Sequence, residues 1–235
     1  MRTVFFGGPQ EGATPPVDYL IPTPLSAAEL RVLGCLIEKS FFTPDIYPLT
    51  LNSLVTACNQ KTSREPVVSY DDLTVEAVLA TLQGRGLTAK ITGADHRVPK
   101  FKELLMEKSG LKVSEIAVLC VMMLRGPQTV NELKDRANRI HAFASQAEVE
   151  ETLDRLIGRE PQPLAVRLPR APGQKEARYM HLLAGPVEVE EAAIAPAPAP
   201  AREDRLGRLE AEVAGLKEQL RRIEEEWKEF RKQFE

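Results

Sequence analysis

The sequence predicts a mainly α-helical protein with small β-hairpins: two tandem winged helix-turn-helix domains followed by a C-terminal coiled-coil helix. Three observations support this prediction. A pattern of three amphipathic helices and a hairpin occurs twice, an Ala-Pro-rich segment follows the second copy, and an unbroken heptad pattern ends the chain. The expected parts are a flexible N-terminal arm at 1–24, domains at 25–108 and 109–185, a linker at 186–204 and a coiled coil at 205–235.

The first predicted helix has both a start signal and a stop signal. Ser26 is an N-cap residue with Glu29 three positions later, the spacing of a capping box. Apolar residues then follow helical spacing, which predicts a helix from about Ala27 to Lys39. The next segment, residues 41–48, contains two prolines and is expected to be non-helical.

The first copy continues with two more helices and a hairpin. Thr50 is expected to cap a helix from Leu51 to about Asn59, and a third helix is expected from about Asp72 to Arg85. Leu87–Ile91 and Arg97–Phe101 have the composition of two short strands. Three helices followed by a hairpin is the element order of a winged helix.

The same pattern returns later in the chain with shorter connections. Similar stretches recur at offsets that fall from 86 to 79 to 74 residues, so the second copy has lost loop residues and kept its helices. The matching pairs are 29–33 with 115–119, 50–54 with 129–133, and 75–85 with 149–159.

The second copy also predicts a basic hairpin. Gly126 and Pro127 separate its first two helices, and strands are expected over Pro163–Leu168 and Arg178–Leu183. The segment between the strands has a Pro-Gly turn and is the wing tip. Because this wing is the more basic one, we expect it to lead any contact with phosphate.

Composition sets limits on function. The chain has 43% hydrophobic residues, and we expect a cytoplasmic protein without a membrane-spanning or signal segment. Its three cysteines are expected to be reduced core thiols. The first copy has ten basic and ten acidic residues over 25–110, and the second has eleven and nine over 111–185. Any DNA contact must therefore come from a local basic patch.

Two segments supply candidate DNA contacts. The polar loop before the third helix and the second hairpin both carry side chains that bind phosphates or base edges. The alternative for the loop is that Asn59 caps the second helix and the other residues are solvated. The third helices are acidic, which favours a protein partner or binding led by the wing. The candidate residues are Asn59, Gln60, Lys61, Arg64, Arg167, Arg170, Lys175 and Arg178.

The sequence predicts no catalytic, cofactor or metal site. His96, His141 and His181 are far apart and lack cysteines or carboxylates at ligand spacing. No phosphate-cradling glycine loop or nucleophile motif is present in the sequence. We therefore expect a protein that is not an enzyme.

The C-terminal segment predicts a homo-oligomer. Apolar residues alternate at spacings of three and four, which is typical of a two-stranded coiled coil. Its charges fit both parallel and antiparallel pairing. The predicted dimerisation residues are Leu206, Leu209, Val213, Leu216, Leu220, Ile223, Trp227 and Phe230.

Three stretches in this order, residues 25–64, 124–143 and 168–185, resemble the YceH-like family of bacterial proteins. The resemblance implies a tandem winged-helix fold, and it supplies no catalytic residues to transfer. Two functions remain open. One is a DNA-binding or transcription-associated regulator that acts as a coiled-coil dimer on double-stranded DNA. The other is a non-enzymatic interaction scaffold whose winged-helix surfaces dock a protein partner.

Overall fold

The computed structural model describes residues 20–93, 96–170, 174, 176–187 and 221. The chain divides into two units, residues 1–189 and 190–235. Within the described residues, the first unit has seven α-helices and two small antiparallel sheets, so the mainly helical class is confirmed. In the second unit only Arg221 is described, and it is helical. The predicted dimerisation residues from Leu206 to Phe230 and linker residues 188–204 lie outside the described residues.

The first half of the first unit contains the three predicted helices and the hairpin. Ser26 and Glu29 form the expected capping box, but α1 continues three residues beyond Lys39, and a short 3-10 turn follows it. A short helix after the hairpin, α4, was not predicted. The elements are α1 (Ala27–Phe42), η1 (Pro44–Ile46), β1 (Leu49–Thr50), α2 (Leu51–Cys58), α3 (Asp72–Gly84), β2 (Thr88–Gly93), β3 (His96–Glu103) and α4 (Leu105–Ser109).

The second half repeats this order with shorter strands. Thr129 and Glu132 form a capping box at the start of its second helix, and Ser145 caps the third. Each strand of its hairpin has three residues, fewer than the sequence predicted. The elements are α5 (Val113–Arg125), α6 (Val130–Ala137), α7 (Gln146–Ile157), β4 (Ala165–Arg167) and β5 (Tyr179–His181).

Each half closes with an antiparallel sheet. In the first, the strand order is β1-β3-β2, and Leu49 pairs with Phe101. In the second, β4 pairs with β5 so that Ala165 lies opposite His181. An isolated bridge joins Tyr179 to Gln128, the residue two positions before α6. This bridge holds the second hairpin beside the start of α6.

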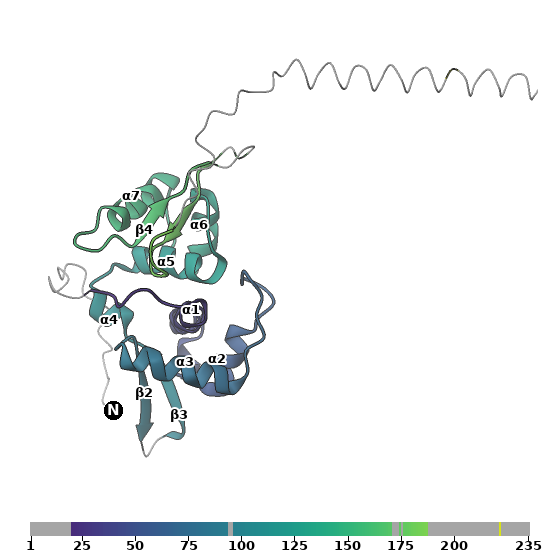
Figure 1. Ribbon diagram of the computed structural model, residues 1–235, viewed down its shortest axis with the longest axis vertical. Helices are drawn as coiled ribbons and strands as arrows, with labels where there is room; N and C mark the ends of the chain where they lie inside the picture. Colours follow the sequence, from purple (N-terminus) through teal and green to yellow (C-terminus); the bar gives the residue numbers. More distant parts are fainter. Residues whose placement is uncertain (1–19, 94–95, 171–173, 175, 188–220, 222–235) are drawn as a thin grey trace, which may run out of the picture. The chain divides into compact units, whose positions relative to one another are not determined.

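The first helices of the two halves, α1 and α5, pack against each other in the centre of the described body (Figure 1). α1 is buried without interruption from Glu29 to Glu38, and α5 from Ser114 to Leu124. A helix buried all round needs neighbours on every side. One continuous core therefore runs through both halves, and it contains the three free cysteines.

The segment before α1 also belongs to this body. Ile21 is buried, and its backbone exchanges two hydrogen bonds of 2.9 Å with the side chain of Gln162. The backbone N–H of Leu25 donates to the carbonyl of Leu183 at 2.8 Å. The predicted flexible arm is therefore too long at its C-terminal end, because residues 20–24 make specific contacts with the second half.

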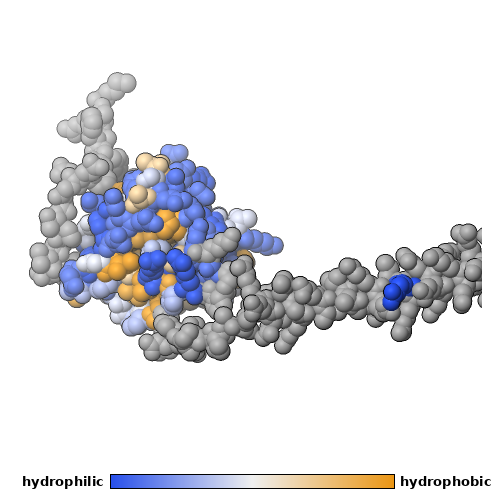
Figure 2. Space-filling model, turned by 90° about the horizontal axis from the view of Figure 1, so that it is seen from above, coloured by the Kyte–Doolittle hydropathy of each residue, from blue (hydrophilic) through white to orange (hydrophobic). Residues whose placement is uncertain are grey.

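One face of the described body is mainly polar. Figure 2 shows one face on which hydrophilic residues form most of the surface and hydrophobic residues reach it near the middle. None of the helices within residues 20–187 combines the length and the apolar composition that a bilayer-spanning segment requires.

Candidate functional site

The loop after α2 is built around hydrogen bonds of its own. The side chain of Asn59 donates to the carbonyl of Tyr70 at 2.7 Å and accepts from its N–H at 2.8 Å. Gln60 accepts from Lys39 and from Arg64. Lys61 is exposed. Of these three candidate contacts, Asn59 and Gln60 have structural partners, and Lys61 is turned to solvent.

Arg64 is placed differently from the sequence expectation. Its side chain is buried and forms a two-pronged ion pair with Glu38, at 3.0 and 2.7 Å, while its Nε donates to the carbonyl of Ala57. Burial alone would raise the pKa of Glu38, but the hydrogen bond and charge of Arg64 outweigh it and lower that pKa. In this conformation the Arg64 guanidinium is committed to the protein interior and does not offer a surface contact to phosphate.

The second hairpin divides its basic residues between solvent and a groove. Arg167 and Arg170 are exposed, and Lys175 lies outside the described residues. Arg178 turns toward the start of α6, where its Nη1 donates to the Pro127 carbonyl at 2.8 Å and lies 3.1 Å from Glu132. The isolated bridge at Tyr179 positions Arg178 there.

A groove of about 420 Å³ lies between the loop after α2 in the first half and residues of the second half. We call it the arginine groove, because four arginines and two glutamates line it. The groove follows from the packing of α1 on α5, and the backbone N–H of Glu65 donates to the carbonyl of Leu124 at 2.8 Å beside it. Its lining residues are Ser63, Arg64, Glu65, Arg125, Pro127, Gln128, Glu132, Arg136 and Arg178.

The carboxylate of Glu132 forms ion pairs with two arginines in this groove. Glu132 lies 3.2 Å from Arg136 and 3.1 Å from Arg178, and it accepts the N–H of Thr129 at 2.9 Å. Burial would raise the pKa of Glu132, but these donors and charges lower it. Arg136 also donates to the side chain of Gln128, which is itself buried. Glu132 therefore stays ionised and fixes two guanidinium groups in place.

Arg125 and Arg136 are groove residues that were not among the candidates from sequence. Arg125 is the last residue of α5, immediately before the Gly126-Pro127 break, so its side chain leaves the end of a buried helix. Arg136 is four residues after Glu132 on α6, the spacing of a helical ion pair. Both signals are present in the sequence, but neither shows that the side chains meet the loop of the other half.

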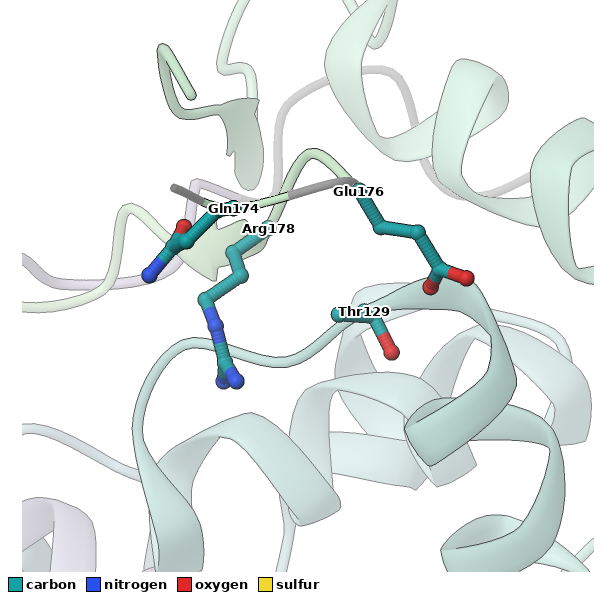
Figure 3. Close-up of a pocket in the computed structure, with 4 residues that line it drawn as sticks. All are labelled: Thr129, Gln174, Glu176 and Arg178. Carbon is teal, nitrogen blue, oxygen red and sulfur yellow. The ribbon is translucent and has the colours of Figure 1, made fainter. Parts of the chain in front are cut away.

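A second, shallower hollow of about 230 Å³ lies on the outer side of Arg178 and is lined by Thr129, Gln174, Glu176 and Arg178. Figure 3 shows Arg178 and Glu176 extending from the hairpin on either side of Thr129. Glu176 contacts Asn131 on α6. The hollow is thus lined by one acidic side chain, Glu176, and one basic side chain, Arg178.

His141 and His181 lie within the second half. His141 lies 3.1 Å from Glu148, and His181 is buried in the second half. Burial lowers the pKa of His181 to about 4, so this side chain is neutral near pH 7. In the described part of the chain, histidine, cysteine and acidic side chains nowhere gather in groups of three or more that would suit a metal ion.

The fold and the groove define a mainly helical protein of two similar halves joined by one core, with a basic groove between them. Residues 25–174 match a family described as "Protein of unknown function, DUF480". A "UPF0502 protein" of Opitutus terrae is 48% identical over 209 residues, covering 89% of this chain and 90% of that protein. Another, of Solibacter usitatus, is 47% identical over 213 residues, covering 90% of this chain and 98% of that protein.

The chain belongs to this DUF480, or UPF0502, family. The predicted membership in a bacterial family of unestablished function is thereby confirmed. The family description names no activity, so the function proposed below depends on the residues of this chain.

Proposed function

We propose that this protein is a non-enzymatic, cytoplasmic DNA-binding protein with two winged helix-turn-helix domains, and that it contacts the phosphates of duplex DNA. The observation that carries this proposal is the arginine groove. It unites the loop at Ser63 with Arg178 of the second hairpin, although these segments lie more than 100 residues apart in the sequence. A basic surface assembled from two segments is the local patch that a chain without net positive charge needs.

The element order of each half supports the winged-helix part of the proposal. Three helices precede an antiparallel strand pair in both halves. In winged helix-turn-helix proteins, the hairpin serves as a wing beside the DNA-contacting helices. On this interpretation, β2–β3 and β4–β5 are the two wings.

The charges on the third helices favour backbone contact over base recognition. Asp72 and Glu76 are exposed on α3, and Glu150, Glu151 and Asp154 are exposed on α7. Carboxylates on a helix in the major groove would face the phosphates that border it. We therefore expect Lys61, Arg167 and Arg170 to contact the backbone, with little sequence preference.

The C-terminal heptads add a second element to this proposal. A homodimer formed through residues 205–235 would present two basic surfaces to one duplex, which raises the overall affinity without new contacts. Such pairing suits a transcription-associated regulator.

The test is binding of labelled random-sequence duplex DNA over a salt series. Arg167→Glu/Arg170→Glu reverses two charges on the second hairpin, and Lys90→Glu/Lys100→Glu reverses two on the first as the matched control. We expect salt-sensitive binding that the first variant loses and the second retains, because each neutralised phosphate contributes a slope of about −0.9 to the dependence of log affinity on log salt. Absence of binding at low salt by the folded parent protein would refute the proposal.

The exposed face of α3 favours a second candidate function, a scaffold that docks a protein partner. Leu73 is 76% exposed on that face, between the acidic residues Asp72 and Glu76. An exposed apolar side chain with an acidic border suits a basic, partly apolar protein surface. If the parent protein fails to bind DNA, pull-down with the parent chain and with Leu73→Asp would test this candidate, and capture that depends on Leu73 would support it.

A further inference from the structure

Arg125 lines the arginine groove and forms no ion pair with any residue that the structure describes. The residue is half-buried, and its guanidinium has no hydrogen bond or ion pair with any residue that the structure describes. Burial, followed by the nearby charges of Arg136 and Arg64, lowers the pKa of Arg125, although the charges of Glu38 and Glu132 act in the opposite direction. A partly buried guanidinium beside other cations is electrostatically unfavourable unless an anion joins it.

The acidic residues near the groove offset this charge only in part. Glu132 is shared between Arg136 and Arg178, and Arg64, whose side chain has no exposed area, is paired with Glu38. Glu65, the other acidic lining residue, is exposed and makes no ion pair within the described part of the chain. The groove therefore keeps an excess of positive charge at Arg125.

Arg178 retains hydrogen-bond donors for a ligand. Its contacts to Pro127 and Glu132 both use Nη1, so Nε and Nη2 have no partner among the described residues. Figure 3 shows its side chain extending toward the connection that precedes Thr129. A guanidinium with Nε and Nη2 available can bind two oxygens of a phosphate in a fork.

The opening of the groove includes a backbone conformation that costs energy. Ser63 has a φ of 61°. Among the described residues other than glycine, it alone has a positive φ. Its carbonyl accepts from Nη1 of Arg64 at 2.9 Å, which holds the loop in this shape. Residues kept in this region cluster at ligand sites, where the fold compensates the cost of about 1–3 kcal/mol.

We propose that the arginine groove binds a phosphate group, with Arg125 and Arg178 as its direct contacts. Glu132 acts as a positioning residue that fixes the guanidinium groups of Arg136 and Arg178. A volume of about 420 Å³ exceeds the size of one phosphate ion and accommodates a phosphate ester. The phosphate comes either from a free phosphate monoester or from a DNA backbone, and these sources share the same recognition chemistry. The inference deepens the proposed function, because it names the groove residues that bind phosphate, and the free-phosphate probes test it apart from the exposed contacts Arg167 and Arg170.

The test uses the full chain and three probes: inorganic phosphate, phenyl phosphate and random duplex DNA. Affinities are measured by calorimetry and by fluorescence anisotropy at constant ionic strength, with chloride as the reference anion. Arg125→Met removes the unpaired charge, and Arg167→Met removes an exposed charge outside the groove as the matched control. Because Arg125 has no described partner to lose, we expect Arg125→Met to retain the thermal stability of the parent. If Arg125→Met does not fold, Arg125→Lys replaces it, since it keeps the charge and loses the fork.

We expect Arg125→Met to weaken the affinity for at least one probe by about tenfold or more. Arg167→Met should leave the affinities for phosphate and phenyl phosphate within about twofold of the parent values. Loss of phosphate or phenyl phosphate binding identifies a free phosphate ester as the source, and loss confined to DNA identifies the backbone. Equal affinity of parent and Arg125→Met for all three probes, or no saturable binding of any probe, overturns the proposal. Failure of the proposed DNA-binding function is recognised separately, as absence of DNA binding while free phosphate still binds in an Arg125-dependent manner.

Discussion

The guanidinium of Arg64 and the carboxylate of Glu38 form a two-pronged ion pair inside the first half, with Nη2–Oε2 at 2.7 Å and Nη1–Oε1 at 3.0 Å. The side chain of Arg64 has no exposed area. The pair links α1 to the loop after α2, and the same arginine donates to the carbonyl of Ala57 on α2. Arg64 thus fixes the loop that forms one border of the arginine groove.

Replacing Arg64 with methionine is expected to destabilise the protein strongly. The substitution leaves the buried carboxylate of Glu38 with the ion pair to Lys39 at 3.2 Å and without its two-pronged contact to Arg64, and we expect a cost of about 3 kcal/mol in the free energy of unfolding. Lys61→Met, three positions earlier and exposed, should change it by less than about 0.5 kcal/mol. Urea unfolding of both variants measures the difference. Similar stability of Arg64→Met and Lys61→Met would show that the ion pair does not hold this loop.

A larger side chain at Gly34 is expected to destabilise the protein. A Cβ at this position would lie 3.0 Å from Cδ2 and 3.1 Å from Cγ of Leu124, at the contact between α1 and α5. Gly34→Val should therefore cost about 1–3 kcal/mol through overpacking. Gly84, near the end of α3, has open space around it, so Gly84→Ala should be neutral or slightly stabilising. Thermal unfolding compares the two, and a Gly34→Val protein as stable as the parent would contradict the close packing of the two halves.

Asn59 is expected to contribute to stability through its two hydrogen bonds with the backbone of Tyr70. Asn59→Ala removes the partners of both the N–H and the carbonyl of half-buried Tyr70, and a loss of about 1–3 kcal/mol follows. Asn52→Ala, on the exposed face of α2, serves as the matched control and should have little effect. The two variants are compared by chemical denaturation and by DNA binding. Weaker DNA binding by Asn59→Ala with unchanged stability would instead assign this residue to DNA contact.

Because of His181, the free energy of unfolding is expected to fall in mild acid. Its folded-state pKa of about 4 lies below the ordinary value of 6.5, so between these values the unfolded chain binds the additional proton. Stability therefore falls as the pH falls from about 6.5 towards 4, by about 2 kcal/mol at pH 5 from this residue alone. Above pH 6.5 the residue is neutral in both states and contributes no slope.

The measurement is the free energy of unfolding at pH 7.5 and at pH 5 for the parent and for His181→Leu. Nδ1 of His181 has no hydrogen-bond partner among the described residues, so leucine removes a titrating group without breaking a bond to that atom. We expect the variant to lose less stability than the parent between the two pH values. Equal losses would show that other groups cause the acid sensitivity.

The sequence determined the local elements because their signals are local. Ser26 with Glu29 and Thr129 with Glu132 form the capping boxes that start α1 and α6. Helical spacing of apolar residues and the repeat at falling offsets likewise depend only on neighbouring positions. Boundaries were less accurate where contacts decided them, as in α1, which continues to Phe42.

The tertiary structure alone decided where the charged residues lie. Arg64 and Lys61 belong to the same basic loop in the sequence, yet one is buried against Glu38 and the other is exposed. Arg125 and Ser63 meet at one groove because α1 packs on α5, a contact between segments far apart in the chain. The physical reason is that a side chain's partner depends on packing between elements, whereas a cap or an amphipathic face depends on residues three or four positions away.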